Sequence, residues 1–280
     1  MVWDAARARG LLAELWPEWA FGTVRPLSSA GWDFVTFLVD EQWVVRIARR
    51  ADARIRLAYE TRKLCQVRQG TFGLPVPIPF YERTARVAGV YRQLAGKPAR
   101  ALSSPVAEML GRQVGRFLRV WHGPALWPRG LDTGRAAARW LSRWERILQD
   151  ANQELWPMLA IKERRRCHGA AAALLARARA FTPVLLHGDM QPGHILHEGG
   201  LITGILDFAD MRVGDPAFDF CGLQGMRRGA LAEYGRPLDA ERIPLYQWAG
   251  QTAAALDALA RGDVEAVERS MTLIRRAIPN

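Results

Sequence analysis

The sequence predicts an α+β fold, with a small antiparallel β-sheet in its first third and a mostly helical remainder. Two patterns indicate this. Apolar and polar residues alternate with a period of two through Phe21–Leu27, Asp33–Val39 and Trp43–Ile47, and turn residues separate these stretches. From about residue 100 onward, apolar residues recur at helical spacing instead, as they do in Val106–Trp121.

The N-terminal elements follow in order from these patterns. We expect an amphipathic helix near residues 3–16, ended by Trp16-Pro17, before the three strands, and a second helix at about 52–68 after them. The proline-bearing segment LPVPIPFYER then leads into a fourth strand, and VAGVYRQ forms a fifth. We place the boundary between two lobes near residue 95, so that the lobes comprise residues 1–95 and 96–280.

The C-terminal part reads as a series of helices, expected near 134–153, 161–180, 217–235, 240–260 and 263–277. His122 ends the helix that contains Val106–Trp121, and a packing or capping role is expected for it rather than ligand binding. Trp140 and Trp144 are one turn apart on a helix, which is typical of a core stripe, although an apolar pocket wall is the alternative.

Composition limits the functional class. The 280 residues include 49% hydrophobic and 24% charged residues, as in an ordinary globular protein. Cys65, Cys167 and Cys221 are too far apart for a metal motif and odd in number, which favours a reducing cytoplasm. No secretory leader and no membrane-spanning apolar run are expected. The net charge of +11 comes mainly from scattered arginines without interleaved aromatic residues, so no nucleic-acid partner is expected. We expect the protein to be a monomer.

The stretch with the most chemical information runs from Val184 to Phe220, VLLHGDMQPGHILHEGGLITGILDFADMRVGDPAFDF. It predicts a buried strand end, a loop with His187-Gly188-Asp189, a short hairpin, and a second loop that begins at Asp207. Asp189 lies five positions before His194 and eighteen before Asp207. Loops that follow buried strands commonly carry functional side chains.

These strings resemble the aminoglycoside phosphotransferase family, the kinase-like small-molecule kinases of bacteria. The family has H-G-D followed by Asn, where protein kinases have H-R-D followed by Asn, and a later Asp at the D-F-G position. Here His194 occupies the Asn position. The loop is similar to H-G-D-L-H-P-G-H-I-L of the macrolide 2′-phosphotransferase branch, from which it differs at Met190 and Gln191. The resemblance implies a two-lobed protein-kinase-like fold.

The resemblance also implies roles for residues of this stretch. Asp189 is expected to be the catalytic base for the acceptor hydroxyl, and His194 and Asp207 the protein ligands of Mg²⁺. His187 and Asp219 would support the catalytic loop. Asp215 is expected to cap a helix that begins at Pro216, and the role of Asp210 is left open.

The strand WVVRIARR resembles V-L-R-I-P-R-R of the macrolide branch, with Ala48 in place of the proline. It places Arg46 where kinases have a phosphate-binding lysine, and Glu60 on the following helix is its expected partner. An edge-strand arginine that merely extends to solvent is the alternative. The remaining nucleotide-binding residues implied by the resemblance are Ser29, in a segment that could also be a plain hairpin, and the hinge residues Arg92, Gln93 and Leu94.

The resemblance implies a cytoplasmic enzyme of antibiotic resistance, a phosphotransferase with an alcohol group as acceptor. We expect transfer of the γ-phosphoryl group of a purine nucleoside triphosphate, GTP in preference to ATP, to the 2′-hydroxyl of a macrolide. Two alternatives stay open: an aminoglycoside or metabolic-alcohol kinase of the same family, and a catalytically weak nucleotide-binding pseudokinase.

Overall fold

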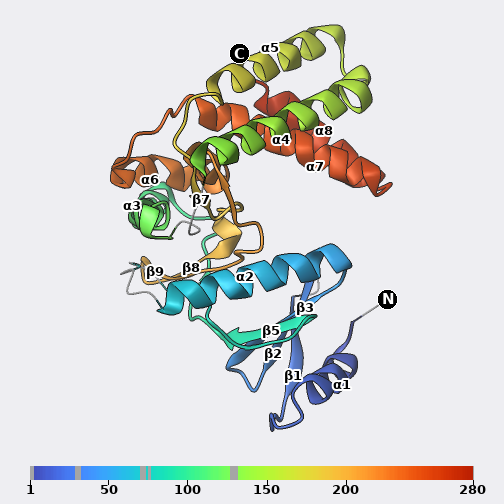
Figure 1. Ribbon diagram of the computed structural model, residues 1–280, viewed down its shortest axis with the longest axis vertical. Helices are drawn as coiled ribbons and strands as arrows, with labels where there is room; N and C mark the ends of the chain where they lie inside the picture. Colours follow the sequence, from blue (N-terminus) through green and yellow to red (C-terminus); the bar gives the residue numbers. More distant parts are fainter. Residues whose placement is uncertain (1–2, 29–32, 70–73, 75–76, 127–131, 280) are drawn as a thin grey trace. The chain divides into compact units, whose positions relative to one another are not determined.

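The computed structural model describes residues 3–28, 33–69, 74, 77–126 and 132–279 (Figure 1). They form two compact units, which we call unit 1 (Met1–Leu102 with Gly193–Asp210) and unit 2 (Ser103–Pro192 with Met211–Asn280). Unit 1 contains a five-stranded antiparallel sheet and unit 2 is mostly helical. The predicted α+β fold is therefore confirmed.

The sheet of unit 1 has the strand order β1-β2-β3-β5-β4, and every neighbouring pair is antiparallel. Its strands are β1 (Val24–Ser28), β2 (Phe34–Val39), β3 (Trp43–Ala48), β4 (Tyr81–Thr84) and β5 (Ala88–Arg92). The three strands predicted from period-two alternation are all present. Strands β2 and β3 are joined by a tight turn in which Asp40 and Glu41 both have positive φ.

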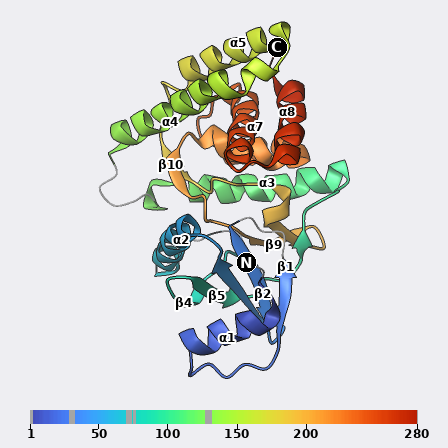
Figure 2. The same ribbon diagram turned by 90° about the vertical axis from the view of Figure 1, so that its right-hand side faces the viewer.

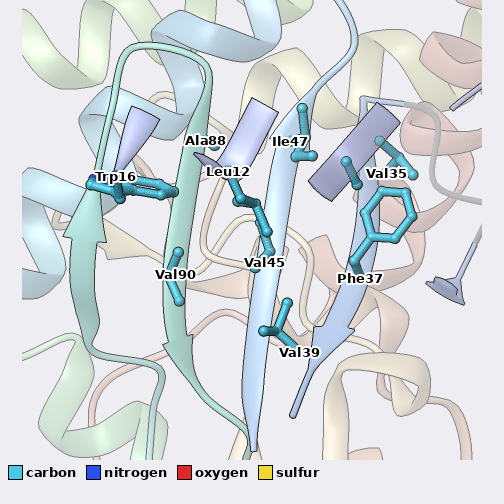
Figure 3. Close-up of a cluster of buried hydrophobic side chains, with 10 residues drawn as sticks. Leu12, Trp16, Val35, Phe37, Val39, Val45, Ile47, Ala88 and Val90 are labelled. Atoms are coloured by element: carbon cyan, nitrogen blue, oxygen red, sulfur yellow. The ribbon is translucent and has the colours of Figure 1, made fainter. Parts of the chain in front are cut away.

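One face of this sheet packs against helix α1 (Ala5–Leu15). Alternate residues of the strands point to this face, and they meet Leu12 and Trp16 from the helical segment in a buried cluster (Figure 3). The strand residues of the cluster are Val35, Phe37, Val39, Val45, Ile47, Ala88 and Val90. Because side chains alternate between the two faces of a strand, Arg46 must point to the other face.

The other face carries helix α2 (Ala51–Gln69), which contacts β3, β4 and β5. This helix is not strongly amphipathic in sequence, yet it buries Leu57, Glu60 and Leu64. Glu60 is fully buried, which is unusual for a carboxylate without a cationic partner. The arrangement of strand and helix thus brings Arg46 and Glu60 to the same interior.

Unit 1 also contains a small sheet with the order β6-β8-β9, formed by β6 (Lys97–Pro98), β8 (Ile195–Glu198) and β9 (Leu201–Ile205). The expected hairpin after the His187-Gly188-Asp189 loop is β8 with β9. Its pairing with β6 places residues 193–210 in unit 1, whereas the sequence division at residue 95 assigns them to the C-terminal lobe. The division into a lobe 1–95 that binds the nucleotide phosphates and a lobe 96–280 that carries the catalytic loop stays a prediction.

The α-helices of the described part of unit 2 are α3 (Ser104–Trp121), α4 (Thr133–Glu154), α5 (Ile161–Arg177), α6 (Arg227–Tyr234), α7 (Arg242–Ala260) and α8 (Val264–Ala277) (Figures 1 and 2). Helix α7 contacts α4, α5 and α8. Helices α3 and α6 approach closely: a Cβ atom added at Gly111 or Gly115 would overlap main-chain oxygens of Met226 and Ala230. His122 is the C-cap of α3, as expected.

The predicted helix 217–235 is two elements instead, the 3₁₀ segment η4 (Pro216–Met226) and α6. The chain kinks at Gln224, where φ is 46°, so a single α-helix cannot continue. Asp215 is the predicted N-cap: its Oδ1 accepts from the N–H of Ala217 at 3.0 Å. Burial raises the pKa of Asp215, and the nearby charge of Arg242 opposes that rise.

Trp140 and Trp144 belong to an aromatic cluster with Phe218 and Tyr246 in unit 2, with ring centroids 5.4–5.9 Å apart. Both tryptophans are buried, so the core interpretation of this stripe is confirmed. Trp140 Nε1 donates to Tyr246 Oη at 2.7 Å, which in turn donates to Asp215 at 3.0 Å. Across the described residues, no helix has the length and apolar character needed to cross a membrane.

Candidate functional site

In unit 2 the loop that carries Asp189 begins where β7 (Val184–Leu186) ends. This three-residue strand is buried and pairs with β10 (Arg212–Gly214). The chain turns at Gly188, which has φ +90°, a conformation that favours glycine. The N–H groups of His187 and Gly188 both donate to the Asp219 carboxylate, at 2.7 and 2.8 Å. The structure therefore contains the support from Asp219 that the sequence predicts.

Asp219 is almost fully buried and has a third partner, the Nε2 atom of His122 at 3.0 Å. The other ring nitrogen of His122 lies 2.8 Å from Tyr234 Oη. Burial alone would raise the pKa of Asp219, but the hydrogen bond and charge of His122, followed by the charge of His187 and the Gly188 N–H, outweigh it and lower that pKa. His122 is thus a buried residue of the interior that links Tyr234 to Asp219. Its connection with the loop was not expected from the sequence.

Asp189 itself is half-buried, and its conformation is fixed locally. Its backbone N–H donates to His187 Nδ1 at 3.2 Å, which ties the ring to the loop. Its carboxylate accepts from the side-chain amide of Gln191: Gln191 Nε2 lies 3.1 Å from one oxygen and 3.0 Å from the other. Gln191 is one of the two loop positions that differ from the macrolide branch string.

In unit 1 the central side chain is Arg46, which is buried on β3. Its Nη1 atom lies 2.8 and 3.0 Å from the two carboxylate oxygens of Glu60, and its Nη2 atom lies 2.8 Å from Asp207 Oδ1. The ion pair with Glu60 that the sequence predicts is therefore present, and the solvent-exposed alternative is wrong. The guanidinium carbon lies 4.2 Å from the ring centroid of Phe34, a cation–π contact.

Tyr81 completes this interior and was not expected from the sequence. Its hydroxyl lies 3.4 Å from Arg46 Nη1, and the ring fits because residue 89 is glycine: a Cβ there would lie 2.5 Å from Tyr81 Cε1. Burial alone would lower the pKa of Arg46, but the charges of Asp207 and Glu60 raise it well above its ordinary value. Burial raises the pKa of Glu60 to about 7, against the charge of Arg46.

The two residues predicted to bind Mg²⁺ are neighbours in unit 1. His194 Nε2 lies 3.8 Å from Asp207 Oδ2, and the N–H of Leu206 donates to His194 O at 2.8 Å. Asp207 has φ 63°, a strained conformation for a residue other than glycine. The residues on both sides of Asp207 are held by backbone hydrogen bonds. The N–H of Leu206 donates to His194 O, and the N–H of Phe208 donates to Glu60 Oε1 at 3.3 Å.

The donor chemistry fits a divalent cation in part. Asp207 offers a carboxylate oxygen, which Mg²⁺ prefers, whereas the imidazole of His194 is a weak ligand for it. Their donor atoms, His194 Nε2 and Asp207 Oδ2, lie 3.8 Å apart, and these are the two residues that would hold the cation. Within the described ranges, no group of three or more His, Cys, Asp or Glu is placed to hold a metal. Triphosphate oxygens and water would have to complete the shell.

The other predicted nucleotide-binding residues are less well defined. Ser29 lies outside the described residues. In the hinge segment, Arg92 stacks over Trp43 at 4.4 Å, and the N–H of Gln93 donates to Gln42 O at 2.8 Å. A purine could use that Gln93 N–H only if this bond opened. The Leu94 side chain packs against Gly204, where a Cβ would lie 2.6 Å from Leu94 Cδ1.

Asp210, whose role the sequence left open, belongs to a charged network beside the Arg46 interior. Arg56 lies one helical turn before Glu60 on α2, and its guanidinium lies 2.8 Å from Asp33 and 3.8 Å from Asp210. Arg50 also contacts Asp33, at 2.7 Å. The spacing of Asp52 and Arg56 was a readable signal for one pair of this network, because residues four apart share one helix face, and their side chains lie 3.1 Å apart.

A curated relative, viomycin phosphotransferase of Streptomyces vinaceus, is 27% identical over 269 residues, which cover 91% of this chain and 88% of that protein. A local match with the uncharacterized protein YcbJ of Bacillus subtilis is 51% identical but spans only 37 residues, 12% of that protein's length.

Two solved structures are similar over nearly the whole chain. The GDP and kanamycin complex of APH(2")-IIia has a TM-score of 0.82 at 19% identity, with 96% of this chain and 97% of that chain covered. Macrolide 2′-phosphotransferase MphH from Brachybacterium faecium has a TM-score of 0.73 at 26% identity, with 97% and 98% covered. The first likeness shows a common fold, that of a kinase-like aminoglycoside phosphotransferase.

The family is decided by a match over most of the chain. Residues 23–259 match the sequence profile described as the phosphotransferase enzyme family, and this range contains the Arg46 interior, the Asp189 loop and Asp219. The chain therefore belongs to the phosphotransferase enzyme family.

Proposed function

We propose that the protein transfers the γ-phosphoryl group of a purine nucleoside triphosphate, GTP in preference to ATP, to the 2′-hydroxyl of a macrolide. The observation that carries this proposal is the buried Arg46 guanidinium, which Glu60 and Asp207 hold at 2.8 Å each. A buried cation of this kind, aimed by a helix glutamate, is the part of a kinase site that orients the α- and β-phosphates.

Arginine suits this role in a particular way. Its planar fork contacts two acidic groups at once, and it stays charged in a buried site where a lysine would tend to lose its proton. In our proposal the guanidinium exchanges its contact with Asp207 for phosphate oxygens, while the bond to Glu60 keeps its direction. The hinge residues Arg92, Gln93 and Leu94, together with Ser29, are proposed to contact the rest of the nucleotide.

Asp189 is the proposed catalytic base. The acceptor oxygen attacks the γ-phosphorus, the bond between that phosphorus and the β–γ bridging oxygen breaks, and the nucleoside diphosphate leaves with the bond's electron pair. The hydroxyl proton passes to a carboxylate oxygen of Asp189. Its backbone is anchored for this task through His187 and the Asp219 carboxylate.

His194 and Asp207 are proposed to hold Mg²⁺, which would neutralise the charge of the triphosphate when bound. The donor set supports this for Asp207 and less strongly for His194. Nucleotide use is supported by the GDP complex of the similar phosphotransferase APH(2")-IIia. The preference for GTP rests on the loop and strand strings shared with the macrolide branch.

The acceptor is proposed to be a macrolide, modified in the cytoplasm by a monomeric enzyme. The PGHIL and VVRIARR strings support the macrolide assignment, as does the 26% identity to macrolide 2′-phosphotransferase MphH. A second acceptor class has support of its own. Viomycin phosphotransferase is 27% identical over 91% of this chain, which favours a basic antibiotic such as viomycin or an aminoglycoside.

The test is a phosphorylation screen of purified protein with Mg²⁺ and either GTP or ATP. The acceptors are erythromycin, kanamycin and viomycin, and mass spectrometry detects the added phosphate. We expect erythromycin to gain one phosphate, more rapidly with GTP, and Asp189→Asn to abolish the product. Modification of kanamycin or viomycin alone would refute the macrolide assignment. Product formation by Asp189→Asn at the wild-type rate would refute the mechanism.

A further inference from the structure

The strongest unassigned feature of unit 2 is the contact between Gln191 and Asp189. Gln191 Nε2 is almost equidistant from the two carboxylate oxygens, at 3.1 and 3.0 Å. An ionised carboxylate can only accept hydrogen bonds, so the amide must present its NH₂ group and not its oxygen. The contact is therefore a directed one, between a neutral donor and both oxygens of the proposed base.

The main chain around Gln191 leaves it little freedom to do anything else. The preceding residue, Met190, is buried, and the following residue, Pro192, restricts the backbone of Gln191 to extended conformations. The loop also lies directly on η4: a Cβ added at Gly222 would overlap Met190 O and lie 3.3 Å from Gln191 Cβ. With the backbone fixed on both sides, side-chain rotation is the remaining freedom, and the carboxylate bond fixes that too.

From this geometry we propose that Gln191 is a positioning residue, which holds the plane of the Asp189 carboxylate toward the acceptor hydroxyl. The inference rests on the proposed role of Asp189 as base. A carboxylate has about four lone-pair directions. Gln191 occupies the side shared by the two oxygens, which leaves the outer directions for the hydroxyl. It does so without a charge that would weaken the base strongly.

The energetic expectation follows from the kind of contact. A misplacement of about 1 Å in a reacting group can cost about 10²-fold in rate. Loss of the donor should therefore lower kcat rather than the affinity for the nucleotide. Gln191→Ala should lower kcat about 10-fold. Gln191→Glu, of equal size but with an acceptor facing an acceptor, should lower it about 10²-fold.

The experiment compares these two variants with Gln191→His and with a matched control. Gln191→His introduces the residue of the branch string, whose ring N–H can still donate, so it should recover kcat relative to Gln191→Ala. The control is Gln247→Ala, which also removes a part-buried glutamine amide of unit 2, one bonded to Arg227 at 2.9 Å. We expect its kcat to equal that of the wild type. The acceptor is whichever of erythromycin, kanamycin and viomycin the wild type phosphorylates.

A second measurement needs no acceptor. In NMR spectra the side-chain amide signals of Gln191 are identified by their loss in Gln191→Ala. The proposal expects these signals to shift strongly in Asp189→Asn, because the charged acceptor is removed. Amide signals that do not respond to Asp189→Asn would overturn the contact, whether or not every variant is active.

The kinetic outcomes separate this inference from the proposed function. If Asp189→Asn is inactive while Gln191→Ala and Gln191→Glu both keep the wild-type kcat, Asp189 remains the base and the positioning role is wrong. If Asp189→Asn keeps full activity, or the wild type phosphorylates none of the three acceptors, the proposed function itself fails. A fall in kcat with an unchanged nucleotide KM, partly restored by Gln191→His, supports the positioning role.

Discussion

Replacement of Asp219 by asparagine should destabilise unit 2 severely, because this buried carboxylate accepts three hydrogen bonds. Its partners are the N–H groups of His187 and Gly188, at 2.7 and 2.8 Å, and His122 Nε2 at 3.0 Å. Each bond to a charged group contributes roughly 1.5–3 kcal/mol. Two of the donors, the His187 N–H and His122 Nε2, share Oδ2, and the Gly188 N–H contacts Oδ1. An asparagine that places its amide oxygen at the Oδ2 position therefore loses one bond, because its NH₂ group faces the Gly188 N–H. The other two bonds lose their charged acceptor. The expected loss in free energy of unfolding is about 3–5 kcal/mol.

Urea denaturation, followed by circular dichroism and by the fluorescence of the 11 tryptophans, measures this loss. With a urea m value of about 3 kcal/mol/M, the midpoint of Asp219→Asn should fall by about 1–1.7 M. The control is Asp132→Asn, in which an exposed helix N-cap with one bond to the Arg135 N–H keeps a good capping residue. Its midpoint should not change measurably.

The pH dependence provides an independent check on Asp219. Its pKa is lowered in the folded protein, so its stabilising contribution is complete above the ordinary aspartate pKa and is lost as pH falls through the folded-state pKa. The difference between the wild type and Asp219→Asn should therefore shrink below about pH 4. A stability loss below about 1 kcal/mol at pH 7, or a difference that is constant through the acid range, would refute the reasoning.

Three further outcomes are expected. Arg46→Lys should raise the nucleotide KM and lower the thermal midpoint, because one ammonium group cannot hold Glu60 and Asp207 together as the guanidinium fork does; unchanged kinetics in a folded variant would contradict the phosphate role. Gly115→Ala should cost about 1–3 kcal/mol of stability in urea titrations, because the new Cβ overlaps the main chain of α6; an unchanged midpoint would contradict the close packing. His194→Asn should keep or raise activity with Mg²⁺ in the phosphorylation assay, since an amide oxygen is the better ligand for a hard cation; complete loss of activity would require another role for His194.

Much of unit 1 could be predicted because its signals are local. Alternation predicted the three strands, and the helix that follows offered Glu60 as the partner of Arg46. The same signals could not supply Tyr81, which reaches the Arg46 interior only because Gly89 on the paired strand leaves room for its ring. Nor could they show that Asp207 accepts from Arg46, since 161 positions separate these residues.

Unit 2 shows the same limit at its helices and its loop. The helix boundaries followed from apolar spacing, but the kink at Gln224 depends on a backbone conformation that composition does not reveal. The bond between His122 and Asp219 joins residues 97 positions apart. His122 could be placed at a helix end, where capping was a sufficient explanation, and its actual partner lay outside any local pattern.

The sequence by itself determined the fold class, the family motifs and the identity of the charged residues in them, because these follow from short-range periodicity and from the order of residue types along the chain. The tertiary structure alone decided which partner each charge has. It buried Glu60, where burial raises the pKa of the carboxyl group and the charge of Arg46 lowers it, and it placed three donors around Asp219. The physical reason is that hydrogen bonds and desolvation act through space, between groups whose separation along the chain carries no information about their distance.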